Sequence, residues 1–150
     1  MGHKVWTAVF DGPGFRDTAA EVAQSINELI GADLQRAVRK GLASRGWSVS
    51  VAWPEDHGWE SEAAYVDEGK EVAMTLVTSP ELDGHTPDGR ALNDRWRVVV
   101  GMDVGMFPKT KAHRLAALQR LAADVQWACE SAGAIDIVWE VGGPIVASAA

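Results

Sequence analysis

The sequence predicts an α+β protein in which two main helices pack on one face of a mainly antiparallel sheet of about six strands. Short apolar segments with a period of two residues occur near both ends of the chain and in its middle. Two longer segments between them have the apolar spacing of amphipathic helices. Consecutive strands joined by short turns pair antiparallel, so we expect the order β-α-β-β-β-β-α-β. An alternative is a ferredoxin-like β-α-β-β-α-β core into which residues 59–78 are inserted as a hairpin.

Residues 4–10 alternate as a strand, and Asp11-Gly12-Pro13-Gly14 ends it with turn chemistry. A helix should follow, with Asp17 or Thr18 as its cap and Glu21 in its first turn. Its apolar residues then recur every four positions, so each step overshoots one helical turn by about 40°. These are Ile26, Ile30, Leu34, Val38 and Leu42. The drift predicts a kink or short break at 31–33, with Asp33 as a candidate cap for a second piece ending near Ser44.

The middle of the chain has the two-residue period of strands. Val49, Val51 and Trp53 should face the core from one strand, and residues 59–66 and 71–78 should form a hairpin around a turn at 67–70. Residues 79–94 form a polar loop that is long for a compact domain. A further strand at 95–102 places its alternate residues on one face, namely Trp96, Val98, Val100 and Met102.

The second main helix is predicted from Thr110, as its cap, to about Ala132. Its buried stripe should consist of Leu115, Leu118, Leu121, Ala122, Val125 and Cys129. A last strand at 134–141 should place Ile135, Ile137, Trp139 and Val141 on one face. We therefore expect one domain over residues 1–141 and a loose tail over 142–150.

Composition narrows the classes of function. The 150 residues contain 14 lysines and arginines against 21 aspartates and glutamates, and the net charge of −7 argues against general binding to nucleic acid or anionic lipid. The single cysteine excludes an internal disulfide framework and any multi-cysteine metal site. No apolar segment approaches the ~20 residues of a membrane span, and the start lacks the pattern of a signal peptide. These features predict a cytoplasmic protein without membrane contact.

The densest group of chemically active side chains lies in residues 53–59: Trp53, Glu55, Asp56, His57 and Trp59. Adjacent carboxylates cannot both face one metal from a regular strand, so this group does not predict a metal site. Residues 55–71 contain seven acids against Lys70 alone, and such a patch attracts a basic partner. We interpret the group as a recognition surface for a protein partner. The alternative is a polar turn whose two tryptophans pack across the strands.

Two features of the second helix are further candidates. Trp127 lies away from the buried stripe, on a face with Arg120 and Asp124, which suggests a docking or self-association surface unless a loop or the tail covers it. Basic side chains surround the helix start, where the helix dipole disfavours cations, so a bound anion is an alternative site. Those side chains are Lys109, Lys111, His113 and Arg114. Neighbouring acids or solvent would offset the same charge.

No catalytic constellation is present in the sequence. There is no Gly-x-Ser-x-Gly motif, Cys129 falls on the buried stripe, and Asp83, His85 and Asp88 do not have the spacing of a calcium loop. We therefore predict no catalytic residue, no metal and no cofactor. A small acidic α+β protein that is rich in tryptophan and has a charged hairpin resembles bacterial immunity or inhibitor proteins, although this likeness of type assigns no residue. The expected function is protein binding; the alternative is an enzyme or small-molecule binder with a pocket between sheet and helices.

Overall fold

The computed structural model describes residues 3–67 and 69–141, so the tail predicted at 142–150 lies outside the described residues. These described residues fold into three helices, one 3₁₀ turn and seven strands. In chain order these are β1 (His3–Asp11), α1 (Ala19–Gln24), α2 (Ala32–Ser44), β2 (Ser48–Val49), β3 (Trp53–Glu55), β4 (Gly58–Asp67), β5 (Lys70–Pro80), the 3₁₀ turn η1 (Leu92–Asp94), β6 (Arg95–Asp103), α3 (Pro108–Ser131) and β7 (Ile135–Val141).

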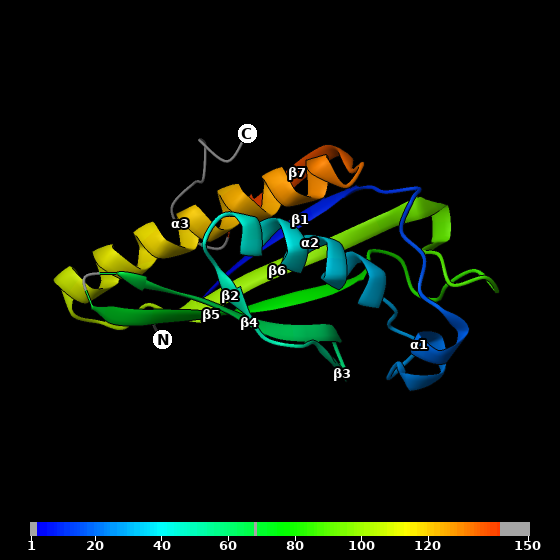
Figure 1. The fold of residues 1–150 in the computed structure, drawn as a ribbon, viewed down its shortest axis with the longest axis horizontal. Coiled ribbons are helices and arrows are strands. Elements are labelled where there is room, and N and C mark those ends of the chain that lie inside the picture. Colours follow the sequence, from blue (N-terminus) through cyan, green and yellow to red (C-terminus); the bar gives the residue numbers. More distant parts are fainter. Residues whose placement is uncertain (1–2, 68, 142–150) are drawn as a thin grey trace.

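All seven strands belong to one antiparallel sheet with the order β2-β4-β5-β6-β1-β7, and β3 pairs with β4 beside β2. The two long helices, α2 and α3, lie on the same side of the sheet (Figure 1). The predicted α+β class is therefore confirmed. The strands β5-β6-β1-β7 and the two helices have the connectivity of the ferredoxin-like alternative. The added strands are β2, β3 and β4, so the insertion precedes β5 instead of ending at residue 78.

The core lies between the sheet and the two helices because side chains alternate along each strand. Trp6 and Phe10 of β1 and Trp96 of β6 are fully buried on the helix side. The helices close this layer with Leu34, Val38, Leu42, Leu118, Leu121 and Val125. The Trp96 indole donates its Nε1–H to the Gly12 carbonyl at 2.9 Å, which fixes the chain where it leaves β1.

The first predicted helix is interrupted for longer than its sequence indicates. Thr18 caps α1 as expected, in a capping box with Glu21, but α1 ends at Gln24. The next residues are not helical, and Asn27 and Glu28 have φ angles of 56° and 59°. The second piece begins at Ala32, inside the predicted break, and its N-cap residue is Gly31, so Asp33 is not the cap. The Asp17 carboxylate, offered by the sequence as a cap for α1, binds the start of α2 instead.

Three other local predictions are wrong. Val51 and Trp53 are 72% and 39% exposed, because β2 ends at Val49 and the chain resumes strand geometry only at β3. Thr110 is not a cap, since α3 begins two residues earlier with Pro108 in its first turn. Ile135 is exposed although Ile137 and Trp139 are partly buried. The pairing of β1 with β7 shifts register between Val9 and Asp11, and Asp136 there has a φ of 57°, so Ile135 does not continue the alternation of β7.

Candidate functional site

The predicted recognition residues lie around a tight hairpin between β3 and β4. Glu55 pairs with Gly58 and Trp53 pairs with Glu60, so Asp56 and His57 form the turn. The Trp53 indole donates its Nε1–H to Glu55 Oε1 at 2.9 Å. Trp53, Glu55, Asp56 and His57 therefore lie close together around this hairpin.

Trp59 does not join this group. Trp53 lies opposite Glu60, and neighbouring side chains of a strand point to opposite faces of the sheet. Trp59 therefore points to the helix side, where it is 6% exposed. The two tryptophans of the hairpin neither form one surface nor pack against each other across the strands.

The hairpin is part of a larger surface, the open face, which is the side of the sheet opposite α2 and α3 (Figure 1). The strand register assigns to it the residues Glu60, Glu62 and Val66 of β4, Glu71, Ala73 and Thr75 of β5, Arg97 and Val99 of β6, Val5, Thr7 and Val9 of β1, and Val138 and Glu140 of β7. Several of its apolar side chains are exposed, and Val66 is 69% exposed. The open face thus combines uncovered apolar surface with acidic side chains.

The acids of the open face are concentrated on one side. Neither β3 nor β4 contains a lysine or arginine. The arginines of this face, Arg95 and Arg97, belong to β6, nearer the centre of the sheet. Both have partners within the protein. Arg95 forms ion pairs with Asp11 and Glu81 at 3.0 Å each, and the Arg97 Nε donates to Ser79 Oγ at 3.2 Å. The excess negative charge therefore lies at the end formed by β3, β4 and the start of β5.

His57 links two of these carboxylates. Its Nδ1 lies 2.9 Å from Asp56 Oδ1 and its Nε2 lies 2.5 Å from Glu60 Oε1. The hydrogen bond to Glu60, together with that to Asp56 and both negative charges, raises the pKa of His57 above its usual value against a smaller desolvation penalty. The ring is half-exposed, so this is a surface ion cluster. It orients the turn and neutralises part of its charge when the imidazole is protonated.

The basic start of α3 lies at the opposite end of the long axis from α1 (Figure 1). It lines a groove of about 920 Å³, whose other wall includes Glu62 and Glu71 of the open face. Lys109, His113 and Arg114 contribute to its wall, whereas Lys111 does not. The Arg114 guanidinium donates to the Asp103 carbonyl at 2.9 Å. The same groove is lined by three carboxylates, Glu62, Glu71 and Asp103. These acids offset the positive charge at the start of α3, which the sequence analysis gave as the alternative to a bound anion. Their presence weakens the case for an anion site.

Trp127 lies where α3 packs against the end of α2. The Arg45 guanidinium stacks over its ring at 3.9 Å from the centroid, and Arg45 is also paired with Asp124 at 3.0 Å. Asp124 accepts a further hydrogen bond from the Trp47 indole at 2.8 Å. The ring is half-buried, and the side chain stacked over it is that of Arg45, the C-cap residue of α2.

This packing predicts that Trp127→Ala mainly costs stability. We expect the free energy of unfolding to fall by about 2 kcal/mol, because the variant loses the cation–π contact and leaves space beside α2. Urea unfolding measures the loss, and sedimentation of the variant should give the same mass as the native protein. A shift to smaller mass with unchanged stability would instead support self-association through this face.

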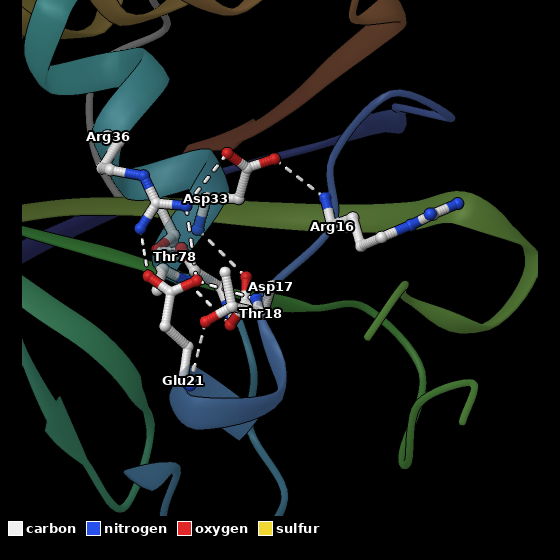
Figure 2. A network of polar contacts seen from close by, with 9 residues as sticks. Arg16, Asp17, Thr18, Glu21, Asp33, Arg36 and Thr78 are labelled. Atoms are coloured by element: carbon white, nitrogen blue, oxygen red, sulfur yellow. Dashed lines mark hydrogen bonds and ion pairs between the residues drawn. The ribbon is translucent and has the colours of Figure 1, made fainter. Parts of the chain in front are cut away.

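The most connected polar cluster involves residues that the sequence singled out only as caps (Figure 2). The buried Asp17 carboxylate accepts from the backbone N–H groups of Gly31, Ala32 and Asp33 at 2.9 to 3.0 Å. Burial raises the pKa of Asp17, while these three hydrogen bonds act in the opposite direction. Around it, Arg36 pairs with Glu21 and Asp33. The cluster joins the loop before α1 to the start of α2, which is a structural role.

The remaining chemical candidates are not brought together. Cys129 is buried, and burial raises the pKa of its thiol above the usual value. His85 bonds to the Thr86 carbonyl while Asp88 pairs with arginines. Within residues 3–67 and 69–141, no group of three or more potential ligand side chains is placed to hold a metal ion. None of the helices in the described part of the chain is long and apolar enough to span a membrane.

Comparison with known proteins adds no assignment to this geometry. No protein-family model, no curated protein and no solved structure matches the chain.

Proposed function

We propose that the protein is an interaction module that binds a basic protein partner through the acidic end of its open face. The observation that carries the proposal is the position of these acids on a sheet face that none of the described helices covers, beside exposed apolar side chains. The acidic end consists of Trp53, Glu55, Asp56, Glu60, Glu62, Val66 and Glu71.

Physical complementarity supports this assignment. An interface gains affinity from desolvated apolar and aromatic contacts at its centre, and surrounding charges steer the partner during encounter. Trp53 and Val66 are large exposed apolar side chains on the acidic end. The basic neighbour of these acids in the β3–β4 turn is His57. Glu62 and Glu71, further along the sheet, share a groove with Lys70 and the basic start of α3. A partner with lysine or arginine side chains around an apolar patch fits this combination.

The test begins with capture of the partner from an extract of the source organism on the immobilised protein. Association rates are then measured for the native protein and for a variant that combines Glu55→Lys with Asp56→Lys. Charges at the rim of an interface act mainly on association, so the rate should fall about tenfold or more at low salt. At about 1 M salt the screening length shrinks to ~3 Å and the two proteins should associate at similar rates.

A matched control separates local charge from net charge. Asp83→Lys combined with Glu130→Lys changes the net charge equally at two exposed positions away from the hairpin, in the loop after β5 and at the end of α3. This control should associate at nearly the native rate. Equal slowing in both double variants, or no slowing in either, would contradict a binding role for the acidic end.

A further inference from the structure

The strand β7 forms one edge of the sheet, and among the described strands it pairs only with β1. The register shift affects only the start of β7, and residues 138–141 pair with β1 without interruption. Alternate N–H and C=O groups of a strand point to its two sides, so half of those in β7 point away from β1. In the part of the chain that the structure describes, no strand pairs with these groups. The outer edge of β7 is therefore an open row of donors and acceptors.

The other edge of the sheet is protected against further pairing, whereas β7 is not. That edge is formed by β2 and β3, which have two and three residues, and Pro54 lies within β3. Short strands, prolines and lysines are common means by which proteins prevent a sheet edge from pairing with another chain. β7 has seven residues and contains neither a proline nor a basic residue. Its edge is therefore suited to accept a further strand.

The side chains of β7 indicate which kind of strand fits. On the open face, Val138 is 62% exposed and Glu140 is exposed. On the helix side, Ile137 and Trp139 pack against the core but are only partly buried. The acids of β7 are Asp136 and Glu140, and no base accompanies them in the strand. An added strand would thus cover apolar surface on the helix side and meet negative charge on the open face.

From this edge we propose that β7 binds an extended segment of another protein by strand addition. In this segment apolar side chains alternate with lysines or arginines. The apolar ones lie beside Ile137 and Trp139, and a basic one lies beside Glu140. Opposite charges on neighbouring strands favour such a segment over an acidic one.

A second copy of this chain fits the edge less well. When two β7 strands overlap fully in antiparallel orientation, Asp136 of one copy lies opposite Glu140 of the other, twice in the pair. Like charges directly opposite each other are destabilising. The β7 edge also lies across the sheet from the acidic end of the open face, which is near the edge formed by β2 and β3. The proposed strand site is therefore independent of the proposed function.

The probe is the synthetic peptide acetyl-Thr-Val-Lys-Val-Lys-Val-Thr-amide, and its control has glutamate in place of both lysines. In the full chain labelled at valine methyl groups, the lysine peptide should shift the Val138 signals to saturation. Those of Val66, which is similarly exposed near the other edge, should not move. The glutamate peptide should bind about fivefold more weakly or less. A shift of Val66 without Val138 would assign the peptide to the acidic end and overturn the strand site.

Hydrogen exchange and N-methylation test the backbone pairing itself. In the free protein, alternate amides within residues 137–141 should exchange rapidly, and saturating lysine peptide should slow them about tenfold or more. Two further peptides are methylated at the amide nitrogens of either the valines or the lysines. Only one of these sets of N–H groups can face β7, so one peptide should lose binding and the other should keep it.

Two variants complete the test. Glu140→Lys should weaken binding of the lysine peptide about fivefold or more, whereas Glu62→Lys, the same change at an exposed position of β4, should not. A protein without residues 142–150 should bind the peptide as tightly as the full chain. The proposal is overturned if Val138 does not respond, if the glutamate peptide binds equally well, or if both methylated peptides bind like the parent. It is also overturned if the β7 amides of the full chain are already protected in a dimer, or are protected until residues 142–150 are removed.

Discussion

Replacing Asp17 with alanine should lower the free energy of unfolding by about 3 kcal/mol, because one buried carboxylate satisfies three backbone donors. The N–H groups of Gly31, Ala32 and Asp33 have their acceptor in this side chain at the start of α2. Gly31 is the N-cap residue and has no side chain of its own to replace it. A helix start that is buried without an acceptor is unfavourable, so α2 should also begin to fray.

Two matched substitutions give the scale of this effect. Thr18→Ala removes an ordinary cap from α1 and should cost about 1 kcal/mol. Asp17→Asn keeps one acceptor oxygen and should fall between the two alanine variants. Urea unfolding measures all three, and amide hydrogen exchange at Leu34 and Gln35 reports fraying of α2. An Asp17→Ala protein no less stable than Thr18→Ala would show that Asp17 is not the cap that matters.

Gly31→Ala should be about as costly, with an expected loss of about 3 kcal/mol. Gly31 has a φ of 151°, and an added Cβ would lie 2.6 Å from the Thr78 carbonyl oxygen. Thr78 cannot easily give way, because it is fully buried in β5, pairs with strands on both sides, and donates its hydroxyl to the Gly31 carbonyl at 2.7 Å. The variant must therefore move either the start of α2 or the middle of the sheet.

Gly14→Ala is the control for this prediction. Gly14 lies in the segment before α1, as Gly31 lies before α2, but its added Cβ would meet nothing within 4 Å. We expect its stability to stay within about 0.5 kcal/mol of the native protein in urea unfolding. If Gly31→Ala is equally harmless, the close approach of Gly31 to Thr78 does not constrain the fold.

The parts of the fold that the sequence predicted depend on local patterns. In β1, β5 and β6 buried apolar residues recur at every second position over much of the strand, and the buried stripe of α3 repeats at helical spacing. Such periods follow from backbone geometry and survive in any environment that buries one face. The α+β class and the placement of both long helices on one face followed from them.

The parts that the sequence did not predict depend on contacts between distant segments. Asp17 caps a helix that starts more than ten residues later, and nothing in its neighbourhood in the sequence distinguishes it from a cap for α1. Val51 alternates with Val49 and Trp53 as a strand residue should, yet β4 pairs with this segment only in two separate pieces. Whether a strand continues is decided by its partner, which one segment does not reveal.

The candidate site was predictable only in part, because some of its features follow from the local sequence and others depend on contacts between distant segments. The sequence grouped Trp59 with Trp53, but a two-residue turn at Asp56 and His57 places Trp53 opposite Glu60 and sends Trp59 to the other face. That register was a signal available in the sequence. The burial of Trp59 beside Gln35 was not, because it depends on how α2 packs over β4.

The most direct measurement of the central claim compares two exposed valines on opposite sides of the sheet. Val66 belongs to the acidic end of the open face, and Val51 is about equally exposed beside α2, on the helix side. In the protein labelled at valine methyl groups, addition of the captured partner should shift or broaden the Val66 signals and leave those of Val51 unchanged. Perturbation of Val51 without Val66 would place the partner on the helix side and contradict binding through the acidic end of the open face.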